Sequence, residues 1–62
     1  MKSAEVIRRI EAEGWVLVRT KGSHRHFKHE SKPGIVTVKH PAKDIPIGTL
    51  KSIERQSGVK LT

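Results

Sequence analysis

Three of the four histidines in this 62-residue sequence stand close together, in the stretch "RTKGSHRHFKH" from Arg19 to His29. Lysines and arginines occupy four further positions of the same stretch. An ordinary imidazole has a pKa of ~6.5 and therefore exchanges protons near neutral pH, whereas lysine and arginine side chains bind phosphate. This combination is compatible with a nuclease site, with a passive nucleic-acid grip and with a metal site.

The position of each histidine follows from strand alternation. If the stretch after the turn Lys21–Ser23 is a β-strand, its side chains point alternately to the two faces of the sheet. Phe27 is the one large apolar residue there and is expected to face the core. The face of Phe27 then also holds Arg25 and His29, and the opposite, open face holds His24, His26 and Lys28. His24 would stand directly after the turn, on an open surface.

A histidine in that position could act on RNA, whose own 2′-hydroxyl is a nucleophile. His24 is the candidate for proton transfer, because one positioned acid-base group contributes ~10²–10⁴-fold to a rate. His26 could be a second acid-base group or could contact RNA without reacting. The candidate phosphate contacts are Lys21, Arg25, Lys28 and Lys39, and Ser23 could donate a hydrogen bond. Spacing alone favours the non-reactive interpretation, because basic surface strands often carry histidines without chemistry.

A metal site is the less favoured interpretation. His24 and His26 lie on one strand face and would suit zinc, but His29 points the other way. His40 would have to come from a neighbouring strand, and no cysteine or nearby acidic pair completes four ligands. The sequence therefore predicts no metal and no cofactor.

The composition favours an anionic partner. Thirteen lysines and arginines against six acidic residues give a net charge of +7 and a pI near 10.4. A small protein with so high a positive charge attracts polyanions, of which nucleic acid is the commonest. The alternatives are that the excess charge serves solubility or that it binds an acidic protein partner. The absence of cysteine excludes disulfides and fits a reducing cytoplasm. The longest apolar run, Trp15–Val18, is far too short to span a membrane.

The elements expected around these residues form one α+β domain over residues 1–62. Residues 3–13 have helical periodicity, with Ser3 as N-cap, and residues 45–58 contain a second helix that ends at Gly58. Three strands lie between them, within residues 15–20, 24–30 and 35–40. The order α-β-β-β-α predicts a three-stranded antiparallel sheet with both helices on one face.

Two apolar stretches need an assignment to core or surface. In the first strand, Trp15 and Leu17 are assigned to the core, with Arg19 at its rim. Val16 and Val18 would then be partly exposed in the chain alone and covered by a partner protein. The opposite assignment, with Val16 and Val18 in the core, stays open. In the last helix, Ile47, Leu50 and Ile53 follow at intervals of three and are expected in the core.

Two longer motifs resemble a known family. "GW-x-L-V-R-T-K-G-S-H-x-x-F" (Gly14 to Phe27) and "VKHPAKDIPIGTLKSI" (Val38 to Ile53) are similar to the HicA toxins of bacterial and archaeal toxin–antitoxin pairs. The resemblance covers nearly the whole chain. It implies a fold similar to the double-stranded-RNA-binding domain and the activity of an mRNA interferase, a ribonuclease that arrests growth.

The resemblance also implies site residues and partners. The catalytic histidine would be His24, and Gly22 and Ser23 would shape the loop that presents it, while the position of His26 is variable. The substrate would be mRNA, and a HicB-type antitoxin would cover the open face around His24. The protein would be a monomer alone and a hetero-oligomer with its antitoxin. The short length argues for a minimal catalytic domain without a DNA-binding segment.

Overall fold

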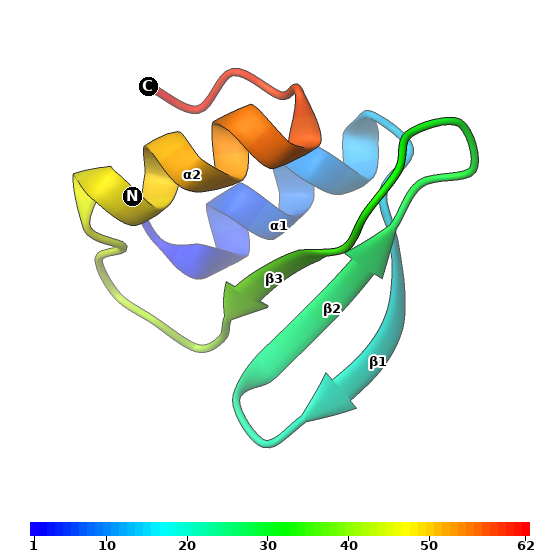
Figure 1. The fold of residues 1–62 in the computed structure, drawn as a ribbon. Helices are drawn as coiled ribbons and strands as arrows, with labels where there is room; N and C mark the ends of the chain where they lie inside the picture. Colours follow the sequence, from blue (N-terminus) through cyan, green and yellow to red (C-terminus); the bar gives the residue numbers. More distant parts are fainter.

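The computed structural model describes all 62 residues and confirms the predicted α-β-β-β-α order (Figure 1). Both helices and all three strands lie where the sequence predicts them, with ends that differ by a few residues. Neither helix is long and apolar enough to cross a membrane. The elements are α1 (Ser3–Ala12), β1 (Val16–Lys21), β2 (His24–Lys28), β3 (Val36–Lys39) and α2 (Ile47–Ser57).

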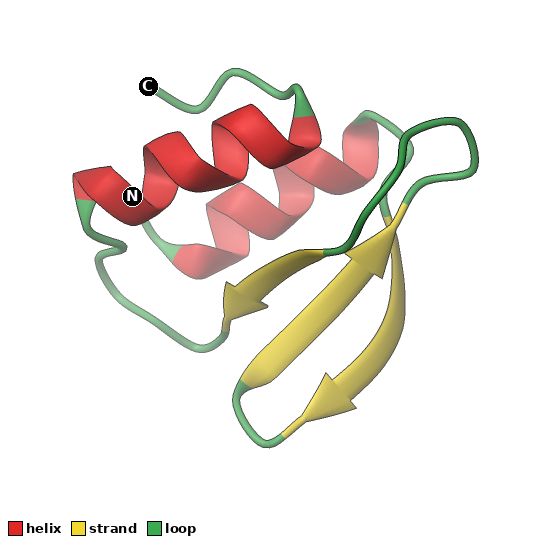
Figure 2. Cartoon of the chain, in the orientation of Figure 1, coloured by secondary structure: helices red, strands yellow, loops and turns green.

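The strands form an antiparallel sheet in the order β1-β2-β3, and the two helices lie side by side on one of its faces (Figure 2). Both helices contact β3, at one edge of the sheet. The β1–β2 turn projects away from the helices (Figure 1). Between helices and sheet lies one cluster of buried apolar side chains, from Val6, Ile10, Trp15, Phe27, Val36, Val38, Ile45, Leu50, Ile53, Val59 and Leu61.

The N-terminus of α1 is built differently from the prediction, because Ser3 is not its N-cap. Lys2 occupies the cap position, and Ser3 is buried in the first turn. The Ser3 hydroxyl accepts the N–H of Ala42 at 2.8 Å and lies 2.8 Å from Nδ1 of His40. Ser3 thereby fastens the β3–α2 connection to α1 instead of satisfying its own helix.

Of the two residues of the first strand that were assigned to the core, Trp15 is buried and Leu17 is not. Trp15 is buried just before β1, and its indole N–H donates to the carbonyl of Ser57 at 3.1 Å. Leu17 is 39% exposed, so its assignment to the core is wrong, while Val16 and Val18 are 62% and 53% exposed. The helices lie over β3 and leave the far edge strand uncovered, so β1 is exposed along its whole length.

The last helix also departs from its predicted stripe. Leu50 and Ile53 are buried, whereas Ile47, in the first turn, is 60% exposed, so its assignment to the core is wrong. Gly58 ends the helix with a φ of 74°, a left-handed conformation that glycine adopts without strain. The chain then turns back along α2, and Val59 and Leu61 complete the core.

Candidate nucleic-acid interface

A two-residue turn places His24 at the projecting end of the sheet. Gly22 has a φ of 58°, and no other residue of the turn has a positive φ, the pattern of a type II′ hairpin turn. The backbone N–H of His40 donates to the carbonyl of Ser23 at 2.7 Å. The turn is therefore fixed to the end of β3, and His24 begins a strand whose start is held from both sides.

The face of the sheet opposite the helices carries a first row of three basic side chains. His24 pairs with Lys21 of β1 on one side and with Lys39 of β3 on the other. Directly opposite residues have Cβ atoms ~4.5–5.5 Å apart, so both ammonium groups can reach a phosphate beside the imidazole. His24 and both lysines are exposed, and a polymer can approach the row freely. We call this face the open face.

A second row lies one step further along β2. His26 pairs with Arg19 of β1 and with Thr37 of β3, and its Nδ1 lies 2.9 Å from the Thr37 hydroxyl. That contact orients the ring, whereas no hydrogen bond within the chain holds the ring of His24. The third row pairs Lys28 with Val16.

Arg19 reaches the open face because β1 contains a bulge. The pairing passes from Leu17–Phe27 directly to Arg19–His26, so Val18 is an extra residue. One extra residue reverses the alternation of side chains beyond it. Arg19, expected at the rim of the core, therefore stands beside His26 on the opposite face.

The charged side chains of the sheet are all positive. No aspartate or glutamate occurs in any strand, whereas the strands hold five lysines and arginines. The ion pairs join Glu5 to Arg8 and Arg9 within α1, and Asp44 to the N-terminal ammonium. No cation of the sheet is paired with a carboxylate, so the open face presents an uncompensated positive field to an anion.

Arg25, a predicted RNA contact, does not join the other candidates. It pairs with Thr20 and Val38 on the helix side of the sheet and is half-buried. Its Nε is buried without a hydrogen-bond partner. The structure thus brings together Lys21, His24, His26, Lys28 and Lys39 on one face, beside the turn Gly22–Ser23, and places Arg25 behind them.

His29 has a structural role at the other end of β2. Its Nδ1 accepts the backbone N–H of Ser31 at 3.1 Å, so the proton is on Nε2, which donates to the carbonyl of Glu13 at 2.9 Å. Its ring lies against Trp15, with 5.3 Å between the centroids. These contacts hold the end of β2 to the end of α1. No group of three or more histidine, cysteine or acidic residues is placed to hold a metal ion.

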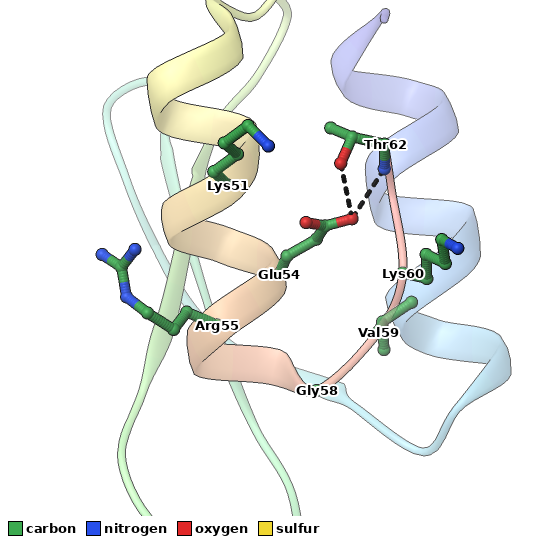
Figure 3. A pocket seen from close by; sticks show the side chains of 7 residues that line it. All are labelled: Lys51, Glu54, Arg55, Gly58, Val59, Lys60 and Thr62. Atoms are coloured by element: carbon green, nitrogen blue, oxygen red, sulfur yellow. Dashed lines mark hydrogen bonds between the residues drawn. The ribbon is translucent and has the colours of Figure 1, made fainter.

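A hollow elsewhere on the surface lies between α2 and the C-terminal segment, lined by Lys51, Glu54 and Arg55 among others (Figure 3). The Glu54 carboxylate accepts the backbone N–H groups of Leu61 and Thr62, both at 2.6 Å, and the Thr62 hydroxyl at 3.0 Å. Hydrogen bonds from Thr62 and Leu61 lower the pKa of Glu54 below its usual value. This carboxylate is occupied in holding the chain end.

The structure adds two residues that the sequence interpretation missed, Arg19 and Thr37. Thr37 could have been found, because alternation within β3 places it between two residues that face the core. Arg19 could not, because its position depends on the bulge and no glycine marks that bulge in the sequence.

Comparisons with known proteins agree with the fold described above. The family model described as the HicA toxin of bacterial toxin–antitoxin systems matches residues 3–59. A chain in a solved structure described as a "HicA3 and HicB3 toxin-antitoxin complex" superimposes with a TM-score of 0.84 and 33% sequence identity, over 100% of both chains. No curated protein matches the sequence. The family match and the shared fold confirm the predicted resemblance, and the chain belongs to the HicA toxin family.

Proposed function

We propose that this chain is an endoribonuclease toxin that cleaves mRNA without a metal ion, with His24 as its proton-transfer group. Residues 1–62 would act as one catalytic domain in the cytoplasm. The observation that carries the proposal is the row Lys21–His24–Lys39, an exposed imidazole between two unpaired cations on a sheet without acidic residues. Membership of the toxin family supports the same conclusion.

The reaction needs only groups that RNA and this face supply. His24 removes the proton of a ribose 2′-hydroxyl, and the resulting oxygen attacks the adjacent phosphorus. The bond from phosphorus to the 5′-oxygen breaks, and that oxygen takes up a proton from a second acid or from water. The products are a 2′,3′-cyclic phosphate and a 5′-hydroxyl. Lys21 and Lys39 offset the charge that gathers on the phosphate in the transition state.

His26 is the second acid in this proposal, or an RNA contact. The Thr37 hydroxyl engages its Nδ1, so Nε2 is the nitrogen left for a substrate. Arg19 and Lys28, in the second and third rows, bind phosphates on the side of His24 that is remote from the turn, and Ser23 donates from the turn. Arg25 stays a predicted contact without support from the open face, because it lies on the other side of the sheet.

The second half of the proposal concerns inhibition. The similar chain was solved in a complex with an antitoxin, and we infer that an antitoxin of the HicB type also neutralises this chain. The partner would cover the open face and offer carboxylates to its cations. Inhibition would then be direct competition with RNA for the same positive surface.

Cleavage of RNA and of DNA of the same sequence in EDTA tests the enzymatic half. The wild-type chain should cut the RNA, leave 2′,3′-cyclic phosphate ends and spare the DNA, which lacks the 2′-hydroxyl. Expression should arrest growth, and His24→Ala should relieve the arrest. Cleavage that stops in EDTA and returns with a divalent cation, or equal toxicity of His24→Ala, would overturn the proposal.

The alternative is a non-catalytic module that binds structured RNA. The acid-free, cationic sheet favours it as much as it favours an enzyme, because phosphate binding needs only the positive field. RNA binding by the wild-type chain without any cleavage would select this alternative.

A further inference from the structure

The outer edge of β1 has no strand partner within the chain. β1 pairs with β2 on one side only, and its six residues are all exposed. Beyond the ladder with β2, no backbone hydrogen bond involves residues 16–21. A row of free N–H and C=O groups at a sheet edge is a template for another strand.

The side chains along this edge are apolar at one end. Val16 and Leu17 point to opposite faces of the sheet, and Val18 occupies the bulge between the two registers. All three side chains are exposed and lie outside the hydrophobic core. Apolar side chains on both faces of one free edge are covered most completely by a strand that lies alongside β1, since such a strand contacts both faces at once.

The other end of the edge decides which strand can bind. Arg19 and Lys21 are cationic and exposed, and no acidic residue lies in the sheet. Two copies of β1 side by side in antiparallel pairing would bring this cationic end against the apolar end of the other copy, with no carboxylate for either. In parallel pairing the cations would face one another. A second copy is therefore disfavoured, and a partner that combines apolar and acidic residues is favoured.

We propose that an extended segment of the antitoxin adds to the outer edge of β1 as a fourth strand. The inference rests on the proposed function, because the partner is the antitoxin of that proposal. The segment carries apolar side chains against Val16, Leu17 and Val18, and acidic side chains against Arg19 and Lys21. Because Lys21 pairs directly with His24, the added strand takes one of the two cations of the first row away from RNA.

The apolar end of β1 contacts the antitoxin alone in this proposal, whereas Arg19 and Lys21 at the cationic end are shared with RNA. Val16 and Val18 lie at the end of β1 that is remote from His24, and neither is among the RNA-binding candidates. A variant with serine at both positions should bind the antitoxin more weakly and keep RNA cleavage. Ile47→Ser is the matched control, because Ile47 is as exposed as Val16 and lies on α2, at the other side of the fold.

The probe is the protein encoded beside this gene, titrated against the wild-type chain, Val16→Ser/Val18→Ser and Ile47→Ser. The double variant should bind it at least about tenfold more weakly, given the apolar area of two half-exposed valines. Ile47→Ser should bind as tightly as the wild type. RNA cleavage and thermal unfolding of both variants are measured alongside and should match the wild type, so that a loss of affinity is not a loss of the fold or of the basal activity.

Hydrogen exchange tests the strand pairing itself. In the complex, the amides of β1 that point away from β2 should exchange more slowly than in the free chain. Unchanged exchange over residues 16–21, or full affinity of the double variant, would overturn the inference and leave the proposed function intact. A dimer of the chain alone that the serine variant abolishes, or the same protection produced by RNA, would overturn it as well. No binding by the wild-type chain would refute the antitoxin half of the proposed function together with this inference.

Discussion

Gly14 lies where a side chain would collide with His29, so Gly14→Ala tests how the end of β2 is held. A Cβ atom on Gly14 would stand 2.7 Å from Nε2 of His29, and the backbone there has a φ of 98°. The ring can move aside only by breaking the contacts that hold it. It donates to the carbonyl of Glu13, accepts from Ser31 and lies against Trp15.

The expected loss of stability follows from these contacts. A non-glycine residue in a sparsely populated backbone region costs ~1–3 kcal/mol. Displacing the ring removes one or two hydrogen bonds, each with a net value of ~0.5–1.5 kcal/mol. The free energy of unfolding should therefore fall by about 2–4 kcal/mol. For a domain of this size each kcal/mol lowers Tm by ~4–8 °C, so Tm should fall by at least about 8 °C.

Thermal unfolding followed by circular dichroism measures this loss, with Gly34→Ala as the control. Gly34 has a φ of 82°, but a Cβ atom on it would meet no other atom within 4 Å, so its substitution reports the backbone cost alone. In a His29→Ala background, Gly14→Ala should become as mild as Gly34→Ala, because the collision is gone. Equal losses for Gly14→Ala and Gly34→Ala in the wild-type background would refute the reasoning.

Two further predictions concern charge. Hydrogen bonds lower the pKa of Glu54 from 4.5, so the stability it adds is complete above that value and is lost as the pH falls through the lowered one. Urea unfolding at pH 7 and pH 3 should therefore show a smaller acid-induced loss for Glu54→Gln than for the wild type or for Glu11→Gln; equal losses in all three would contradict the anchoring role. Lys21→Ala and Lys39→Ala should each weaken RNA binding and reduce the slope of log Kd against log salt by ~0.7–0.9, as expected for one lost phosphate contact. Lys51→Ala, on the helix side, should leave that slope unchanged, and an equal change there would show that binding is not confined to the open face.

The order of elements and most of the core could be predicted because both depend on local patterns. Helical spacing selects Val6 and Ile10, and the lone Phe27 fixes which face of β2 is buried. The same alternation places His24 and His26 on the open face. These predictions need no knowledge of how far the helices extend over the sheet.

The exceptions depend on distant packing. Leu17 points to the helix side of the sheet, yet it is exposed because no helix extends over β1. Ile47 fits a core stripe but lies in a turn of α2 that the sheet does not cover. Ser3 has the residue type of an N-cap, and its hydroxyl instead binds Ala42, a partner 39 positions away that no local pattern reveals.

The central claim is that His24 moves a proton and does not merely bind RNA. The most direct test is the single-turnover cleavage rate of His24→Ala at saturating RNA, with Kd measured on the same RNA. The rate should fall by ~10²–10⁴-fold while Kd changes only a few-fold. A rate within a few-fold of the wild type, or a loss that higher RNA concentration restores, would contradict the claim.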